Sequence, residues 1–387
     1  MYDLLWLLLP VAAVSGWSLA KRDARVKVAA APSLSSDYFT GLNYLVNEQP
    51  DKAIECFVRM LEVDSDTVEI HLAVGNLFRQ RGEVDRAIRI HQNLISRSTL
   101  SKQQRAQALF ELALDYMRSG LFDRAESLCK ELIGMESRTA RALALLSDIY
   151  QQEKEWNQAI AVTRRLQDKT GQVMGQAIAQ FYCELAEEAR GAGKVREARE
   201  RLAQALETDP KCVRASMILG EMAGAAGECG EAIRAYRQVE QQDPAYLPEV
   251  IPALVKSYLA CDSRNDLMDY LTRLFKERGG ISVLLALVEQ IRQQEGREKA
   301  LTFLRRHLHD YPSLRGAAQL MKMGLESAGD GERDTLALLN DTIVKTLEEK
   351  PVYQCTQCGF AGRVLHWHCP GCKRWNTVKP IQGLEGE

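Results

Sequence analysis

The sequence predicts an all-α fold, namely a superhelical solenoid of repeated helix pairs with a transmembrane helix before it and a small metal-binding knuckle after it. Three observations lead to this prediction. Small residues recur about every 34 positions, an uncharged apolar run opens the chain, and four cysteines are bunched near residue 360. We therefore expect a transmembrane anchor at 1–20, a basic flank and linker at 21–36, a solenoid of about eight to nine units at 37–349, and a four-cysteine domain at 350–387.

The repeat is defined by one apolar position, nearly always alanine, that follows an acidic or polar residue near the start of a helix. Successive anchors are 34, 38, 34, 39, 34, 35 and 33 residues apart. Spacings that cluster at 34 residues are typical of helix-pair repeats. The anchors are Ala53, Ala87, Ala125, Ala159, Ala198, Ala232, Leu267 and Ala300.

Other positions keep the same register. Small residues stand twelve positions before most anchors, where they let two antiparallel helices approach closely, and aromatic residues stand nine before several. Glycines five positions before the anchor end the first helix, because the left-handed conformation suits glycine. Prolines twelve positions after it stop the second helix. This pattern is similar to the tetratricopeptide repeat (TPR), and the glycines and prolines are Gly82, Gly120, Gly193, Gly227, Pro210, Pro244 and Pro312.

Some units depart from the pattern. A large apolar residue usually follows the anchor by four positions, but His91, Cys129 and Thr163 stand there in three units. A ninth unit around Ala337 is weak, and the helix over 333–349 is expected to cap the array.

A helix-pair solenoid provides an extended concave surface that is suited to binding proteins. First-helix residues are expected to line this face, so Asn76, Arg79, Met117 and Arg118 are candidate partner-binding residues. The alternative is that each of the four belongs to an ordinary solvated helix surface.

The N-terminus predicts a retained membrane anchor. Leu4–Ala20 contains no charged residue, and 17 helical residues span roughly 25 Å. The basic residues lie after this run, at Lys21, Arg22, Arg25 and Lys27, so the positive-inside rule places the rest of the chain in the cytoplasm. A cleaved signal peptide is the alternative, but its basic leading region is missing.

The tail carries two C-x2-C pairs separated by ten residues: Cys355, Cys358, Cys369 and Cys372. Four thiolates suit one tetrahedral Zn²⁺ ion, and the same ligands also suit iron or a redox-active thiol pair. His366 and His368 are expected to lie outside the ligand set. Trp367, Trp375, Phe360 and Tyr353 are expected to form the small core of this domain. The remaining six cysteines stand singly, which is typical of small buried residues in a reducing compartment.

Composition limits the classes of function. The net charge is −2, which gives no basic footprint for a nucleic-acid partner. No phosphate-binding loop, G-x-S-x-G or H-E-x-x-H motif is present. The sequence therefore predicts a binding protein and no enzyme.

The order of these parts resembles the lipopolysaccharide assembly protein B family of Gram-negative bacteria. The likeness is clear over the stretch 79–92, in Phe181-Tyr-Cys-Glu-Leu-Ala186, in Trp367-His-Cys-Pro-Gly-Cys-Lys-Arg-Trp375 and in Lys379-Pro-Ile-Gln-Gly-Leu384. The four cysteines carry over directly as metal ligands.

The resemblance implies a single-pass inner-membrane adaptor with its C-terminal domain in the cytoplasm. It implies that the membrane protease FtsH degrades the lipid A deacetylase with the help of this adaptor, which restrains lipopolysaccharide synthesis. A membrane anti-adaptor of the PbgA/YejM type and the lipopolysaccharide export proteins are further implied partners. Two other functions remain open: a general TPR scaffold or co-chaperone, and a redox protein with an iron-loaded rubredoxin-like centre.

Overall fold

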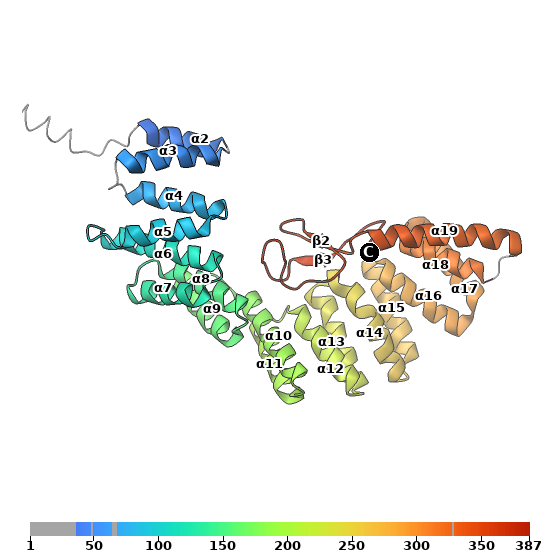
Figure 1. Ribbon diagram of the computed structural model, residues 1–387. Helices are drawn as coiled ribbons and strands as arrows, with labels where there is room; N and C mark the ends of the chain where they lie inside the picture. Colours follow the sequence, from blue (N-terminus) through green and yellow to red (C-terminus); the bar gives the residue numbers. More distant parts are fainter. Residues whose placement is uncertain (1–35, 48, 64–67, 327–328) are drawn as a thin grey trace, which may run out of the picture. The chain divides into compact units, whose positions relative to one another are not determined.

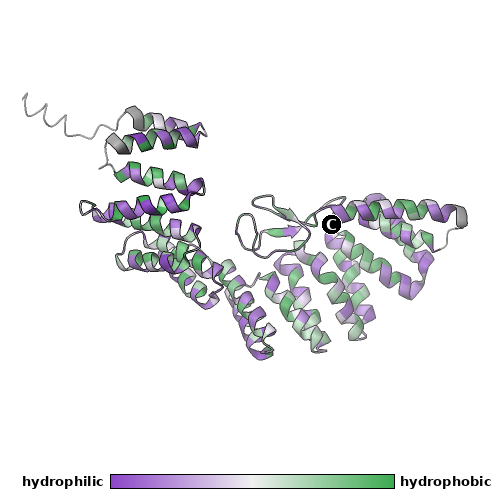
Figure 2. Cartoon of the chain, viewed as in Figure 1, coloured by the Kyte–Doolittle hydropathy of each residue, from purple (hydrophilic) through white to green (hydrophobic). Residues whose placement is uncertain are grey.

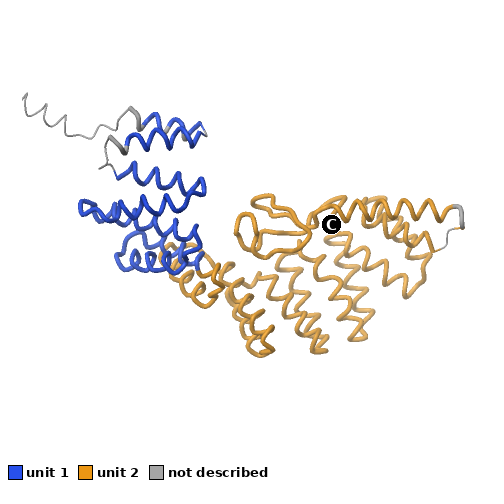
Figure 3. The backbone as a smooth tube through the Cα atoms, viewed as in Figure 1, with its two compact units in different colours: residues 1–149 blue, residues 150–387 orange. Residues whose placement is uncertain are grey.

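The computed structural model describes residues 36–387 except 48, 64–67 and 327–328, and it is helical up to Glu349 (Figure 1). The chain forms two compact units, residues 1–149 and 150–387 (Figure 3). The helices of the first unit are α2 (Ser36–Val46), α3 (Pro50–Val63), α4 (Val68–Gln80), α5 (Val84–Ile95), α6 (Lys102–Arg118), α7 (Phe122–Gly134) and α8 (Thr139–Gln152), the last of which runs past the boundary.

The second unit continues the helical array and ends in a small sheet. Its helices are α9 (Trp156–Thr170), α10 (Gly175–Gly191), α11 (Val195–Thr208), α12 (Val213–Ala225), α13 (Cys229–Gln242), the 3-10 turn η1 (Pro244–Tyr246), α14 (Leu247–Ala260), α15 (Arg264–Arg278), α16 (Ile281–Glu295), α17 (Arg297–Asp310), α18 (Leu314–Leu325) and α19 (Asp330–Glu349). The sheet consists of β1 (Tyr353–Cys355), β2 (Ala361–Gly362) and β3 (Val378–Pro380).

The predicted repeat is present in the helices. All eight anchors lie on the second helix of a pair, from α3 to α17, and each has no exposed surface. Apolar and polar residues alternate around the helices (Figure 2), as expected when one face of each helix is buried. Ala337, the anchor of the weak ninth unit, is only half-buried on α19.

The small residues allow the helices of a pair to approach closely. A Cβ atom added at Gly75 would lie 2.3 Å from Nε2 of His91, and one at Gly220 would lie 2.5 Å from the Tyr236 ring. The same holds for Gly41 and Phe57, at 2.6 Å. His91 therefore fills the position that an aromatic residue fills in other units, which explains how this departure from the pattern is accommodated.

The turns between paired helices have a left-handed residue where it was predicted. Gly82, Gly120, Gly193 and Gly227 have φ between 74° and 84°. Two units without glycine place Lys154 and Asp262 at the same position, with φ of 59° and 53°. Helices α11, α13 and α17 each end two residues before a proline.

The prediction that six cysteines stand as isolated thiols was wrong for two of them. Cys229, at the start of α13, and Cys261, which follows α14, form a disulfide with their Cα atoms 5.7 Å apart. They lie near the turns of neighbouring helix pairs, so a spacing of 32 residues brings them together. Cys56, Cys129, Cys183 and Cys212 are buried and take part in no disulfide, as expected.

Among the residues that the structure describes, no helix is both long and apolar enough to cross a bilayer. The predicted transmembrane helix at 1–20 lies outside the described residues. The same is true of the flank and linker at 21–36, except for Ser36, which begins α2.

Candidate metal centre and its docking surface

The C-terminal sheet holds the first cysteine pair in place. Its strand order is β2-β1-β3, and both pairings are antiparallel, with Tyr353 opposite Gly362 and Cys355 opposite Val378. Cys355 ends β1, and the turn that follows contains Cys358 and is closed by Gly359 at φ 75°. The second pair lies on the loop between β2 and β3, where the backbone N–H of Cys369 donates a hydrogen bond to the carbonyl of Arg374.

The four cysteine sulfurs converge on one point. Each lies within 4.8 Å of the other three. The Cys355–Cys372 and Cys358–Cys369 Sγ distances are 3.8 and 3.7 Å. A tetrahedral ion with bonds of about 2.3 Å to sulfur separates its ligands by about 3.8 Å. The donor set therefore fits one tetrahedral metal ion.

Local features favour a thiolate at Cys355, whereas at Cys358 a backbone hydrogen bond from Phe360 lowers the pKa but burial and hydrogen bonds with the other three cysteines outweigh it and raise the pKa to about 11. Burial raises the pKa of the Cys355 thiol, but its hydrogen bonds with Thr377 Oγ1 and with two backbone N–H groups outweigh this and lower the pKa to about 6. The Thr377 hydroxyl lies 3.3 Å from the sulfur. Gly371 leaves space beside the centre, because a Cβ atom there would lie 3.2 Å from Sγ of Cys358.

The two histidines of this segment lie beside the centre, not among the four converging ligands. His368 bonds through Nε2 to the carbonyl of Lys373 at 2.8 Å and stacks on the Trp375 ring. His366 packs edge-on against Phe360. That the four cysteines complete the ligand set stays a prediction.

The prediction that Trp367 and Trp375 form the core of the knuckle was wrong. Tyr353 and Phe360 do pack around the cysteines, together with Leu365 and Val378. The two tryptophans instead pack against the helices of the second unit. With so few residues between the cysteine pairs, the knuckle has little interior, and its large aromatic side chains are buried against a neighbouring surface.

Trp367 stacks on Tyr246, with the ring centroids 5.3 Å apart. Tyr246 is fully buried, and its hydroxyl lies 3.0 Å from Oδ1 of Asn376 and 2.9 Å from the carbonyl of Val378. The guanidinium of Arg214 also lies 6.0 Å from the centroid of the Trp367 ring and is paired with Glu184 at 2.7 Å.

Trp375 enters a second aromatic cluster. It meets Trp156 and Phe181 edge-on at 6.3 and 5.8 Å between ring centroids. Its Nε1 donates a hydrogen bond to Gln151 at 2.8 Å. A tryptophan with both its ring packed and its N–H bonded is well suited as an anchor at an interface.

Two polar contacts complete the docking. Lys379 pairs with Asp243 at 2.7 Å, and the Tyr353 hydroxyl donates to Glu249 at 2.9 Å. These contacts attach the knuckle to residues from the end of α8 through α14, and Figure 1 shows it beside the helices of its own unit. No sequence signal marks Tyr246, Arg214 or Gln151, because each acts only through a contact distant in sequence.

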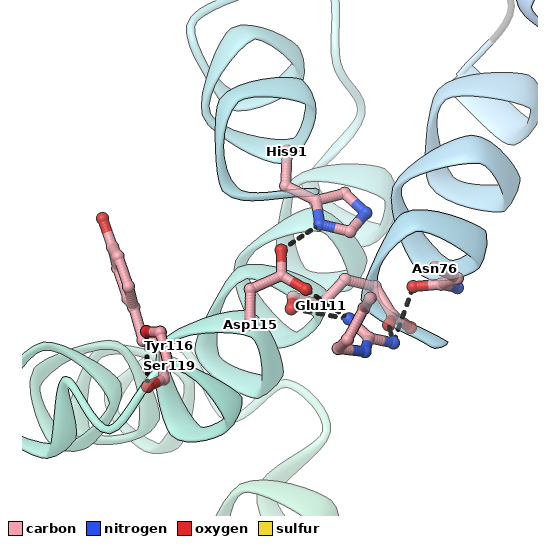
Figure 4. Close-up of polar contacts among 7 residues, drawn as sticks. Asn76, His91, Glu111, Asp115, Tyr116 and Ser119 are labelled. Carbon is pink, nitrogen blue, oxygen red and sulfur yellow. Dashed lines mark hydrogen bonds and ion pairs between the residues drawn. The ribbon is translucent and has the colours of Figure 1, made fainter. Parts of the chain in front are cut away.

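The four candidate partner-binding residues lie in the first unit. The Arg79 guanidinium, on α4, donates to Glu111 and Asp115 on α6 at 2.7 Å each and to Asn76 at 2.7 Å. Asp115 also bonds Nδ1 of the fully buried His91 at 2.5 Å, and Figure 4 shows this ring directed at the carboxylate. Arg79 and Asn76 thus take part in a buried network that joins neighbouring helix pairs.

Met117 is half-buried and Arg118 is exposed near the end of α6. The structure does not bring these two residues into the network around Arg79. That all four contact a partner stays a prediction.

Two family models match the chain. The rubredoxin metal binding domain matches residues 353–380, and the tetratricopeptide repeat matches residues 40–95, 110–172 and 183–246. The geometry and these matches define a class: a TPR solenoid protein with a rubredoxin-type, zinc-ribbon metal-binding domain.

Full-length relatives give the particular family. The chain is 38% identical to lipopolysaccharide assembly protein B of Escherichia coli K12 over 388 residues and 35% identical to that of Haemophilus influenzae over 395 residues, covering 100% of both chains in each case. The chain belongs to the lipopolysaccharide assembly protein B family. The crystal structure of MamA covers 44% of this chain and 95% of its own at 21% identity, with a TM-score of 0.31, and adds nothing to this assignment.

Proposed function

We propose that this protein is a non-catalytic adaptor that takes part in lipopolysaccharide assembly and restrains lipid A synthesis. The observation that carries the proposal is the match to lipopolysaccharide assembly protein B over the full length of both chains. The match therefore includes both the helical repeats and the metal-binding domain of this chain.

The contacts between knuckle and solenoid support a scaffold role. Trp367, Trp375 and Lys379 attach the knuckle to residues of the solenoid more than 120 positions away in sequence. An adaptor must hold two partner proteins in a fixed position relative to each other. A docked knuckle gives the second unit two such binding surfaces, one on the helices and one on the knuckle.

Zn²⁺ is the proposed ion, bound by Cys355, Cys358, Cys369 and Cys372. It has no redox chemistry of its own and would hold the two turns together. Because a segment of this size has little core, the ion would supply part of its folding free energy.

At a finer level, the proposed partners are the membrane protease FtsH and the lipid A deacetylase. The adaptor would present the deacetylase to the protease, and a PbgA/YejM-type membrane protein would oppose it. Contact with the lipopolysaccharide export proteins would link synthesis to transport. A membrane anchor at 1–20 would support this role, because confinement to one membrane raises the effective concentration of the partners.

Depletion of the protein tests the adaptor role. The half-life of the deacetylase should lengthen while its rate of synthesis is unchanged, measured by pulse-chase labelling. A variant in which Cys369 is replaced by Ser should behave like depletion if the knuckle is required. An unchanged deacetylase half-life on depletion would reject the protease-adaptor role and favour a general TPR scaffold.

The proposed location is the inner membrane, with a single span and the C-terminal domain in the cytoplasm. A reporter that works only in the cytoplasm should be active when fused after Glu387, and one that works only in the periplasm should be inactive. The mature protein should retain residues 1–20. Periplasmic reporter activity, or a mature chain that begins near Lys21, would contradict this topology.

A further inference from the structure

The segment that follows β3, residues 381–387, lies against the helices of the second unit. Ile381 N bonds to the carbonyl of Val352, and Leu314 N, at the start of α18, bonds to the carbonyl of Leu384. Most of the segment is nevertheless exposed, including Leu384 at 53%. Glu387 differs from the rest, because only 7% of its side chain is exposed.

The Glu387 carboxylate is held by groups from two helices. One oxygen accepts a hydrogen bond from the backbone N–H of Ser282 at 3.1 Å, and the other accepts one from the Ser282 hydroxyl at 2.5 Å. The Arg315 guanidinium pairs with the carboxylate and also donates to the Ser282 hydroxyl at 3.1 Å. We call Ser282 and Arg315 the carboxylate clamp.

The clamp combines three favourable terms for an anion. Ser282 lies in the first turn of α16 (Ile281–Glu295), where the free N–H groups and the helix dipole attract negative charge. Arg315 adds a full positive charge, and charge-assisted hydrogen bonds are stronger than neutral ones. Both functional groups are directed at the same carboxylate, which indicates a recognition site and not a chance surface pair.

A cavity of about 280 Å³ adjoins the clamp. Its lining includes Glu387 and Gln382, and Arg278 brings a second positive charge to it. Most of the remaining lining is small or apolar: Pro244, Ala245, Leu247, Pro248, Gly279, Gly280 and Val283, with Ser282. A peptide that carries a carboxylate at one end and a short apolar stretch beside it would fit this surface.

One acidic side chain opposes an incoming carboxylate. The Glu249 carboxylate accepts a hydrogen bond from the Tyr353 hydroxyl, which lowers its pKa. Burial is the largest effect and raises this pKa, Glu387 raises it further, and Arg315 of the clamp lowers it. Arg315 therefore acts on both carboxylates, Glu249 and Glu387, and Arg278 adds a second positive charge to the residues that line the cavity. Removing Glu387 leaves a net positive site.

We propose that the carboxylate clamp is a binding site for an acidic peptide segment, and that Glu387 is its resident, displaceable occupant. A partner with a matching segment would bind to the clamp and release residues 381–387. Because the resident segment is tethered, it competes at a high effective concentration, so a free peptide binds weakly until Glu387 leaves.

The bound conformation predicts which peptides match. The resident segment forms a compact turn in which Gly383 N bonds to the Glu387 carbonyl and Glu387 N bonds to the Ile381 carbonyl. A Cβ atom at Gly386 would lie 1.9 Å from that Ile381 carbonyl. The site therefore selects glutamate preceded directly by glycine.

A labelled peptide tests the proposal. The probe is the heptapeptide IQGLEGE, acetylated and amidated so that its only anionic groups are side-chain carboxylates. Fluorescence anisotropy would measure its binding to the full chain in detergent. The Glu387→Ala chain should bind it at least ten times more tightly than wild type. Glu385→Ala is the matched control, because Glu385 is exposed and pairs with Lys350 at 3.1 Å, and this variant should behave like wild type.

Three further measurements define the site. Adding Arg315→Ala to Glu387→Ala should abolish binding, and so should a probe ending in Gln or one with Ala for the last glycine. Metal content and helicity of each variant establish that it is folded. Equal binding to wild type and Glu387→Ala, or no binding to either, would overturn the proposal and leave residues 381–387 as a structural latch.

A measurement on the unmodified chain covers the case in which the variants do not fold. Excess probe should accelerate hydrogen–deuterium exchange at residues 381–387 of wild type, and the Gln-terminated probe should not. Unchanged exchange at saturating probe would also reject displacement. Neither measurement depends on the adaptor role, so the two proposals can fail separately.

Discussion

Nε1 of Trp375 donates a hydrogen bond to the side chain of Gln151 at 2.8 Å, although the two residues are 224 positions apart in sequence. The same indole contacts Trp156 and Phe181. This contact and the Trp367–Tyr246 stack make the knuckle part of the second unit and not a separate appendage.

Replacing Trp375 with Ala should release one side of the knuckle. The loss of an aromatic anchor at an interface typically costs about 2 kcal/mol or more. Limited proteolysis should therefore cut the segment between α19 and β1 faster than in wild type, while the metal stays bound. Val364→Ala is the control, since Val364 is 64% exposed on the same knuckle. Equal cleavage of the two variants would show that Trp375 does not anchor the knuckle.

Replacing Cys369 with Ser should abolish stoichiometric metal binding and unfold residues 350–387, because the remaining core is too small to fold alone. The helical signal should persist, since the repeats carry their own core. Chelators or acid should have the same effect on wild type, because thiolates must be deprotonated to bind the ion. Elemental analysis and circular dichroism would measure both changes.

Cys129→Ala is the control for that experiment. Cys129 is fully buried, and burial raises the pKa of its thiol to about 12, so it is inert toward metal. If the purified protein contains iron and its visible absorption changes reversibly on reduction, the bound ion is iron and not zinc. An ordered knuckle without metal would contradict the structural role of any ion.

Replacing Arg79 with Ala should destabilise the first unit. It leaves the buried carboxylates of Glu111 and Asp115 without their cation, and removing one partner of a buried pair costs about 3–5 kcal/mol. Arg118→Ala, at an exposed position, should change stability little. Chemical denaturation of both variants would measure the difference. If both are equally stable and Arg79→Ala only weakens partner binding, Arg79 belongs to the binding face instead.

The carboxyl of Glu249 gives the attachment of the knuckle a dependence on pH. Burial raises its pKa, and this outweighs the Tyr353 hydrogen bond that lowers it. A raised folded-state pKa favours the protonated form, so its contribution to stability is full below the unfolded value of about 4.3 and is lost as pH rises through the folded value. Glu249→Gln removes the titration, so its stability relative to wild type should increase over that rise. A constant difference from pH 4 to pH 8 would contradict this account.

The repeat architecture could be predicted because it depends on local and near-neighbour physics. Each unit needs a small residue opposite a large one, as at Gly75 and His91, and a left-handed residue in its turn, as at Gly120. These requirements recur at a fixed spacing, so one chain contains many examples of the same rule. The four cysteines could be predicted for a similar reason, since two tight turns place each pair within reach of one ion.

The remaining features depend on contacts between residues far apart in sequence. From sequence, Trp367 and Trp375 are typical core residues of a small domain. Only the folded second unit places Tyr246 beside Trp367 and Phe181 beside Trp375, where the tryptophan rings pack against them. The disulfide and the carboxylate clamp arise in the same way, because stacking of helix pairs brings Cys229 to Cys261 and Glu387 to Arg315. The sequence by itself determined the repeating unit and the ligand set, whose rules act over a few residues or one repeat. Tertiary structure decided how the knuckle is attached, because that depends on surfaces that exist only once the helix pairs have stacked.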